Sequence, residues 1–176
     1  MGHKQAALER FLEIFMAGST DLRRAFGQFG TGVAIIALRD SQNRAVGLTV
    51  NSFASVSLEP PLLSWCLAND SQLFADVSQA SRFSVNVLAA DQLALSNRMA
   101  GPASHILQDD EFLEGENGTP LVQGALAQFD CHIHDRVALG DHIMLIGGID
   151  AVRHCSQGRA PLMYFRGNYA GIEVGP

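Results

Sequence analysis

The chain has 176 residues, of which 47% are hydrophobic and 17% charged, and its formal net charge is −6. This length fits one domain with a core that needs no disulfide or metal for stability, and the composition excludes a disordered chain. A nucleic-acid partner is not expected, because binding to a phosphate backbone requires clustered lysine and arginine, and Lys4 is the only lysine.

Three cysteines, Cys66, Cys131 and Cys155, stand at irregular spacing. An odd and sparse set of this kind indicates reduced thiols, so we expect a cytoplasmic protein. Charged residues interrupt the apolar positions near the N-terminus, which argues against a signal peptide. No apolar stretch is long enough to cross a bilayer, so no membrane association is expected.

Apolar residues recur at spacings of three and four near the N-terminus, which predicts an amphipathic helix ending at Gly18. A second short helix is predicted around residues 22–26, capped by a polar residue among 19–21. A short apolar segment rich in β-branched residues then precedes a polar turn, so residues 32–51 are predicted to form a β-hairpin. The remaining predicted strands cover residues 62–67, 83–88, 125–137, 143–152 and 162–165.

Two further helices are predicted, one starting at the N-cap residues 69–71 and one over residues 91–100. Residues 101–120 contain several glycines and prolines and are predicted to form a loop. The predicted strands are joined by short helices, without the regular alternation of strand and helix that a parallel sheet requires. This pattern predicts a mainly β fold, a β-barrel with short peripheral helices.

Residues 27–32, with the sequence GQFGTG, invite comparison with a dinucleotide-binding loop. A Rossmann loop follows a strand and opens a helix, whereas here a helix is predicted before the glycines and a strand after them. The spacing, G-x-x-G-x-G, also differs from that fingerprint. We therefore assign no Rossmann site to this segment.

Hydroxyl and amide side chains are frequent in residues 47–57. On a strand, Thr49 and Asn51 face one side, while Leu48 and Val50 face the other. Such a polar ladder can bind a ligand that carries several hydrogen-bond donors and acceptors, but it can also be the solvent-facing side of a strand. The residues by themselves leave both interpretations open.

Two other segments have both a functional and a purely structural interpretation. The predicted helix start at residues 69–71 can bind an anion or be a plain N-cap, and the Asp70 carboxylate would repel an anion unless it points away. His132 and His134 share one face of a predicted strand and can bind one metal ion, but Cys131 would face the opposite side. Because no metal-binding motif accompanies them, no metal site is assigned.

Ordered motifs carry a stronger signal than any of these segments alone. They include LRRAFGQFGTGV at residues 22–33 and GLTVNSFASVSLEPP at residues 47–61. Shorter motifs follow at residues 83–88, 124–127, 140–142 and 161–169. Together, over roughly residues 21–171, they resemble the short-chain flavin reductases. The resemblance implies an FMN-binding split barrel, usually a homodimer with the flavin near the subunit interface. Many members are reductase components of two-component aromatic-ring monooxygenases, such as 4-hydroxyphenylacetate 3-monooxygenase.

The resemblance also implies which residues bind the cofactors. The flavin ring and ribityl chain would be lined by Thr49, Val50, Asn51, Ser52 and Phe53, followed by Ser55 and Val56. The phosphate-side loop would comprise Asp70, Ser71 and Gln72, with Arg98 as a phosphate partner in place of a lysine. The nicotinamide would lie near His142 and the C-terminal aromatic residue Tyr169.

The expected activity is therefore reduction of FMN or FAD by NADH or NADPH, with a separate oxygenase receiving the reduced flavin. The protein positions the two cofactors and excludes water, and His142 is expected to orient the nicotinamide or stabilise charge. Two alternatives stay open: a flavin-binding protein without reductase activity, and a metal-dependent barrel that uses His132 and His134. Residues 1–18 are expected to be an N-terminal helical extension, and residues 19–176 the split-barrel domain.

Overall fold

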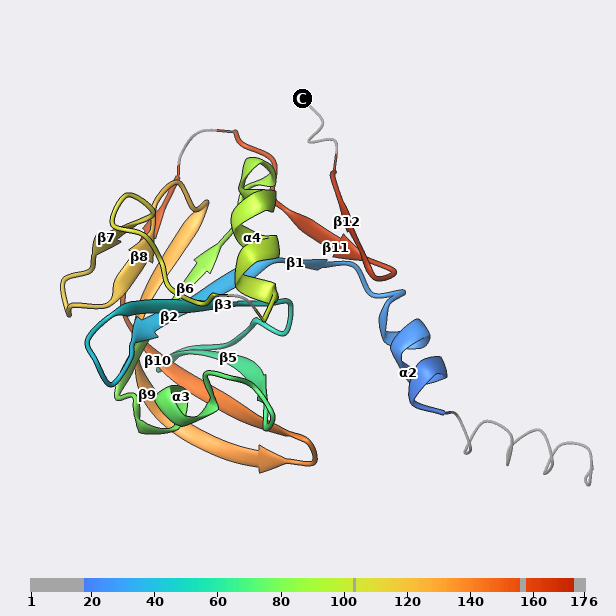
Figure 1. Ribbon diagram of the computed structural model, residues 1–176, viewed down its shortest axis with the longest axis horizontal. Coiled ribbons are helices and arrows are strands. Elements are labelled where there is room, and N and C mark those ends of the chain that lie inside the picture. The colour runs from blue at the N-terminus through green and yellow to red at the C-terminus, as the bar shows by residue number, and fades with distance from the viewer. Residues whose placement is uncertain (1–17, 103, 156–157, 173–176) are drawn as a thin grey trace, which may run out of the picture.

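The computed structural model describes residues 18–102, 104–155 and 158–172 of the chain (Figure 1). An antiparallel sheet of seven strands forms its body, in the order β3-β2-β6-β9-β10-β5-β4. These strands are β2 (Ala34–Arg39), β3 (Ala45–Val50), β4 (Ala54–Leu58), β5 (Pro61–Ala68), β6 (Arg82–Val87), β9 (Ala127–Leu139) and β10 (His142–His154). The smaller sheets pair β1 (Thr31–Gly32), β11 (Met163–Phe165) and β12 (Asn168–Ala170), and β7 (Phe112–Glu114) with β8 (Pro120–Val122). The helices are α2 (Ser19–Phe26), α3 (Phe74–Gln79), η1 (Ala90–Gln92) and α4 (Leu93–Ala100).

Strand β2 shows why this part of the sequence is continuously apolar. Alternate side chains of a strand point to opposite faces of the sheet. Ile36 and Leu38 pack into one buried cluster, and Ile35 and Ala37 pack into another. Because both faces of β2 are covered, the strand has no polar, solvent-facing side.

The predicted hairpin at residues 32–51 is confirmed as β2 and β3, and every other predicted strand is present. The predicted loop is partly wrong, because β7 lies within it and pairs with β8. The predicted helix start at residues 69–71 is also wrong. These residues form a turn after β5, in which the Ser71 N–H donates to Ala68 O at 3.0 Å, and α3 begins only at Phe74.

The N-terminal helix predicted before Gly18 lies outside the described residues. Gly18 itself is the N-cap of α2, and no side chain caps that helix. The polar residues predicted as its cap, 19–21, lie within the helix instead.

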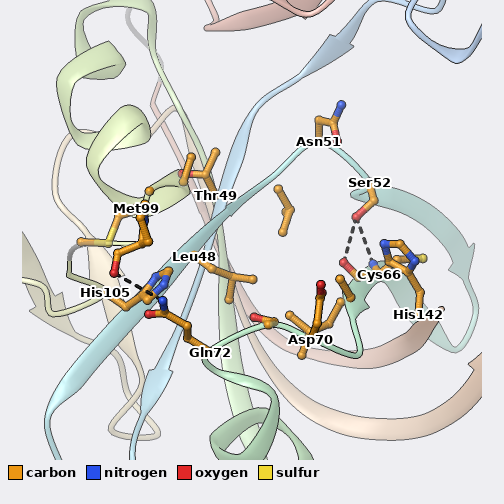
Figure 2. Close-up of a pocket in the computed structure, with 17 residues that line it drawn as sticks. Leu48, Thr49, Asn51, Ser52, Cys66, Asp70, Gln72, Met99, His105 and His142 are labelled. Carbon is orange, nitrogen blue, oxygen red and sulfur yellow. Dashed lines mark hydrogen bonds between the residues drawn. The ribbon is translucent and has the colours of Figure 1, made fainter. Parts of the chain in front are cut away.

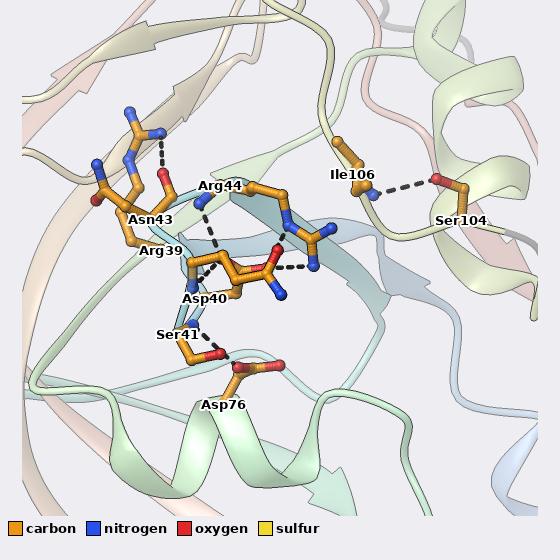
Figure 3. Close-up of polar contacts among 9 residues, drawn as sticks. Arg39, Asp40, Ser41, Asn43, Arg44, Asp76, Ser104 and Ile106 are labelled. Carbon is orange, nitrogen blue, oxygen red and sulfur yellow. Dashed lines mark hydrogen bonds and ion pairs between the residues drawn. The ribbon is translucent and has the colours of Figure 1, made fainter.

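The turn between β2 and β3 is held by one carboxylate (Figure 3). Asp40 accepts hydrogen bonds from the backbone N–H groups of Gln42 and Arg44 at 2.9 and 2.8 Å, and from the Arg44 guanidinium at 2.7 Å. Burial opposes ionisation of this carboxyl, but the hydrogen bonds from Arg44 and Gln42 hold its pKa below the ordinary value. The Ser41 N–H donates to Asp76 at 3.3 Å and links the turn to α3.

Helix α2 and the β1-β11-β12 sheet lie at one side of the molecule, with α2 extending away from the barrel (Figure 1). No side chain of α2 is buried. Phe26 and Phe29 are 73% and 77% exposed, and Leu22 and Phe165 are also exposed. Within the described residues, none of the helices has the length and apolarity needed to cross a membrane.

Candidate functional site

A cleft of about 480 Å³ lies where β3 and β5 end, between α4 and the loop before α3 (Figure 2). This volume is within the range of roughly 300–1,000 Å³ that is typical of pockets for small molecules and cofactors. The walls of the cleft are formed by residues 48–52, 66–68, 70–72 and 99–102, together with His105 and His142.

Two hydroxyl groups join the elements around the cleft. Thr49 on β3 donates to the carbonyl of Ser96 on α4 at 2.7 Å. Ser52 accepts a hydrogen bond from the Cys66 N–H at 3.0 Å and donates to the Cys66 carbonyl at 3.3 Å. These bonds position the segment after β3 against both α4 and β5, so the backbone of residues 49–52 becomes a fixed wall of the cleft.

His142 lies at the end of the cleft near Ser52 and Cys66 (Figure 2). Its Nδ1 is 2.8 Å from the carboxylate of Asp141. The hydrogen bond and charge of His142 hold the pKa of the Asp141 carboxyl below its usual value. Because an ionised carboxylate only accepts hydrogen bonds, Nδ1 is the donor in this pair.

The Cys66 thiol keeps this end of the cleft uncharged. Cys66 lines the cleft, and its partial burial raises the pKa of the thiol above its ordinary value. The group is therefore a neutral thiol near pH 7 and presents no anion to a bound molecule.

A second, smaller pocket adjoins the cleft, since Thr49, Val50 and Asn51 line both. This pocket has a volume of about 190 Å³, and Tyr164 and Tyr169 form another part of its wall. The two tyrosine rings meet edge to face, with centroids 5.5 Å apart. The arrangement provides two adjacent binding spaces that share residues 49–51 and Ala100 of α4.

Residues 26–173 match the family model described as "Flavin reductase like domain". The chain belongs to this flavin reductase family. It is 38% identical over 148 residues to the probable flavin reductase of Rhizobium meliloti (strain 1021), a match that covers 84% of this chain and 47% of that protein. It is 35% identical over 151 residues to HsaB, the reductase subunit of a flavin-dependent monooxygenase from Rhodococcus jostii (strain RHA1), which covers 86% of this chain and 76% of that protein.

A solved structure shows the same fold. The NADH:FAD oxidoreductase SgcE6 of Streptomyces globisporus, in complex with NAD and FAD fragments, aligns with a TM-score of 0.80 at 31% identity, over 89% of this chain and 93% of that one. The predicted split-barrel fold is thus confirmed. The chain spans about half the length of some of the curated relatives that it matches.

The structure brings most of the residues suggested by the family resemblance to the cleft. Those that line it are Thr49, Val50, Asn51, Ser52, Asp70, Ser71, Gln72 and His142. Tyr169 lines the adjoining pocket. Phe53, Ser55 and Val56 are not among the residues of the cleft wall. Phe53 packs on Phe129 with ring centroids 5.7 Å apart, whereas Ser55 and Val56 are exposed on the edge strand β4.

Arg98 also lies away from the cleft wall. Its guanidinium donates to the carbonyl of Ile106 at 2.8 Å and forms an ion pair with Glu111. The next residues along α4, Met99 and Ala100, face the cleft instead. The structure therefore gives Arg98 a role in holding the 104–111 segment and does not place it for direct contact with a phosphate.

The cleft also contains residues that were not predicted as site residues: Leu48, residues 66–68, residues 99–102 and His105. Residues 99–100 were predicted only as the end of a helix, and residues 101–102 only as the start of a loop. His105 stood in the predicted loop without a motif around it, and only its position beside β3 makes it a cleft residue.

Of the two histidines considered as metal ligands, His132 has a carboxylate partner. His132 Nδ1 is 2.8 Å from Asp150, which also accepts a hydrogen bond from Arg82 at 2.8 Å. The neighbouring thiol of Cys131 is buried, and burial together with the nearby carboxylates of Asp130 and Asp150 raises its pKa to about 12. Within the described ranges, no group of three or more potential metal ligands is present.

Proposed function

We propose that this protein reduces FMN or FAD with NADH or NADPH and passes the reduced flavin to a separate monooxygenase. The observation that carries the proposal is the junction of two binding spaces at residues 49–51. The larger cleft has a volume suited to a flavin, and the pocket beside it has room for a nicotinamide ring. Hydride transfer requires two rings held in contact, and adjoining cavities support that arrangement.

The chemistry of the cleft fits a flavin. Leu48 and Leu67 provide apolar surface for a flat ring system, while Asn51 and the backbone of the same segment provide polar groups for its edge. Among the described residues of the wall, Asp70 is the only one with a carboxylate, and the neutral Cys66 adds no second negative charge. A bound flavin supplies the redox chemistry by accepting a hydride.

The residues of this chain then have positioning roles. The β3 segment is fixed by Thr49 and Ser52 and separates the two spaces. His142, oriented by its hydrogen bond to Asp141, places a polar group at the Ser52 end of the cleft and orients the nicotinamide amide or stabilises charge during transfer. Tyr164 and Tyr169 cover the nicotinamide pocket and exclude water.

The rest of the nicotinamide dinucleotide can occupy a further pocket that adjoins the second one. A third pocket of about 450 Å³ shares Asn51 and Tyr164 with the second one and carries Arg23, Phe29 and Arg166 in its wall. The two guanidinium groups suit a pyrophosphate, and an exposed aromatic ring suits stacking with adenine. We assign this pocket to the dinucleotide portion of the donor.

We also propose that the protein is a cytoplasmic homodimer. Leu22 and Phe26 of α2 and Phe165 of β11 are exposed apolar residues within the described part of this protomer. Burying them against a second copy removes apolar surface from water. The thiols of Cys66, Cys131 and Cys155 are unpaired, in keeping with a reducing compartment.

The test is an anaerobic absorbance titration of the purified protein with FMN or FAD, followed by NADH and then NADPH. Loss of the flavin absorbance band after addition of NADH or NADPH identifies a reductase and its hydride donor. Bound flavin that stays oxidised with both donors would instead identify a flavin-binding protein without reductase activity. Sedimentation equilibrium on the same sample measures the oligomeric state, and a monomer at micromolar concentration contradicts the homodimer.

A further inference from the structure

We propose that His105 is the cationic side chain that contacts the phosphate of the bound flavin. This inference rests on the proposed function, because it places a flavin in the cleft. No sequence motif marks His105, and its assignment comes from the geometry and charge of the cleft wall.

Few side chains in the cleft wall can carry a positive charge. Among the cleft residues in the described part of the chain, the basic side chains are His105 and His142, and there is neither lysine nor arginine. A phosphate group binds best to charge-assisted donors. These two imidazoles are therefore the side chains of the wall that can supply a positive charge, and Asp70 adds a negative one to the same wall.

The positions of the two histidines decide between them. His142, Ser52 and Cys66 lie at one end of the cleft, and His105, Gln72 and Met99 lie at the other (Figure 2). His142 is paired with Asp141, whose carboxylate opposes the binding of a further anion. The smaller pocket includes neither histidine in its wall, but it shares Asn51, the neighbour of Ser52, with the cleft. A flavin whose ring lies beside Asn51 and Ser52, toward the His142 end, has its phosphate at the His105 end (Figure 2).

The ring of His105 is oriented by β3. Its Nδ1 lies 3.0 Å from the carbonyl of Gly47, and a carbonyl oxygen only accepts, so Nδ1 carries a proton. Nε2 is then the ring atom left for a ligand. In the imidazolium form, the ring donates one hydrogen bond to Gly47 and one to a phosphate oxygen.

The backbone around His105 is held as firmly as the ring. The Gly47 N–H donates to His105 O at 2.7 Å, and the Leu107 N–H donates to Ala45 O at 2.9 Å. Val46 and Ile106 form an antiparallel bridge, so this segment is a short addition to the edge of β3. The position of the imidazole is thus set before a ligand binds, which lowers the entropic cost of the contact.

Arg98 stabilises the 104–111 segment, which carries His105. Its guanidinium holds Ile106 O, and its ion-pair partner Glu111 accepts a hydrogen bond from the Gln108 N–H at 2.8 Å. On the other side of His105, the Ser104 hydroxyl accepts from the Ile106 N–H at 3.3 Å (Figure 3). Arg98 is therefore a positioning residue for His105 and supports phosphate binding without touching the flavin.

The test compares the affinities of FMN and riboflavin, which differ by the phosphate alone. Dissociation constants are measured by fluorescence titration for the wild-type protein, for His105→Ala, and for His134→Ala, which removes an exposed imidazole outside the cleft wall. We expect His105→Ala to weaken FMN binding about tenfold or more, as for a lost charge-assisted hydrogen bond, and to leave riboflavin binding within about twofold. His134→Ala is expected to change neither constant.

Riboflavin binding reports whether the variant cleft is intact. If His105→Ala does not fold, His105→Asn replaces it, because the asparagine amide can still donate to Gly47 O while carrying no charge. Equal weakening of FMN and riboflavin, or unchanged FMN binding, overturns the role of His105 while leaving flavin reduction in place. If the wild-type protein binds neither flavin, the proposed function fails together with this inference.

Discussion

The hydroxyl groups of Tyr169 and Ser96 are 2.9 Å apart, which links strand β12 to helix α4 across 73 positions of the sequence. Ser96 is fully buried, and its carbonyl also accepts the hydrogen bond from Thr49. One turn of α4 thus connects the wall shared by the two cavities with the aromatic wall of the smaller one. This connection makes the smaller pocket depend on the docking of the C-terminal segment.

Tyr169→Phe removes this hydrogen bond and keeps the ring. We expect the free energy of unfolding to fall by about 1–3 kcal/mol, because a buried hydroxyl at Ser96 loses its partner. Urea unfolding measures the change, with Tyr164→Phe on the neighbouring ring as a control. In a Ser96→Ala background, Tyr169→Phe should lower the free energy of unfolding much less. Equal losses in both backgrounds would contradict an interaction between the two hydroxyl groups.

His142→Ala should lower turnover by up to about a hundredfold at saturating flavin, as expected when a donor ring loses its orientation. The FMN dissociation constant should stay nearly unchanged, because the 49–52 segment, which we propose binds the flavin, is unaltered. Steady-state kinetics and fluorescence titration measure the two quantities. A loss of FMN affinity with normal turnover would show that His142 binds flavin instead.

Arg98→Gln should weaken FMN binding several-fold while sparing riboflavin, since it loosens the segment that carries His105. A residue that merely stabilises the fold would affect both ligands alike. Glu111→Gln is the matched variant, because its amide oxygen can still accept from the Gln108 N–H, and its effect on the ratio of the two constants should be smaller. The decisive quantity is the ratio of the FMN and riboflavin dissociation constants, measured by the same titrations.

Asp40 should contribute to stability in a pH-dependent way. Its pKa in the folded protein is lower than in an unfolded chain, so its contribution is complete above about pH 4 and is lost as the pH falls through the folded value. Asp40→Asn should therefore destabilise the protein at pH 7 and converge with the wild type in acid. Urea unfolding from pH 7 to pH 3 tests this, with the exposed Asp110→Asn as a control.

Gly147→Ala should destabilise the barrel by about 1–3 kcal/mol, as for overpacking of a core. A Cβ at this position would lie 2.5 Å from the ring of Phe83 and 3.2 Å from Leu63, both of which are buried. At Gly148 the clash is with the ring of His132, which is partly exposed and can move. Thermal unfolding of both variants should show the larger loss for Gly147→Ala.

Local patterns in the sequence determined the strands. The continuous apolar stretch with its β-branched residues, followed by a polar turn, depends on neighbours along the chain, so the β2–β3 hairpin was predictable. The start of α3 was misplaced because residues 69–71, which resemble an N-cap, form a turn closing β5. The resemblance to flavin reductases predicted residues 49–52 and His142 as site residues, and all of them line the cleft.

Only the tertiary structure decided which polar side chains face the cleft and which support it. Arg98 and His105 are close in sequence and both basic, and nothing in their neighbours distinguishes a ligand contact from an ion pair. The orientation of α4 directs Arg98 to Glu111, and the pairing of residues 105–107 with the edge of β3 directs His105 to the cleft. Both outcomes depend on packing between segments far apart in the chain, which no local pattern of residues contains.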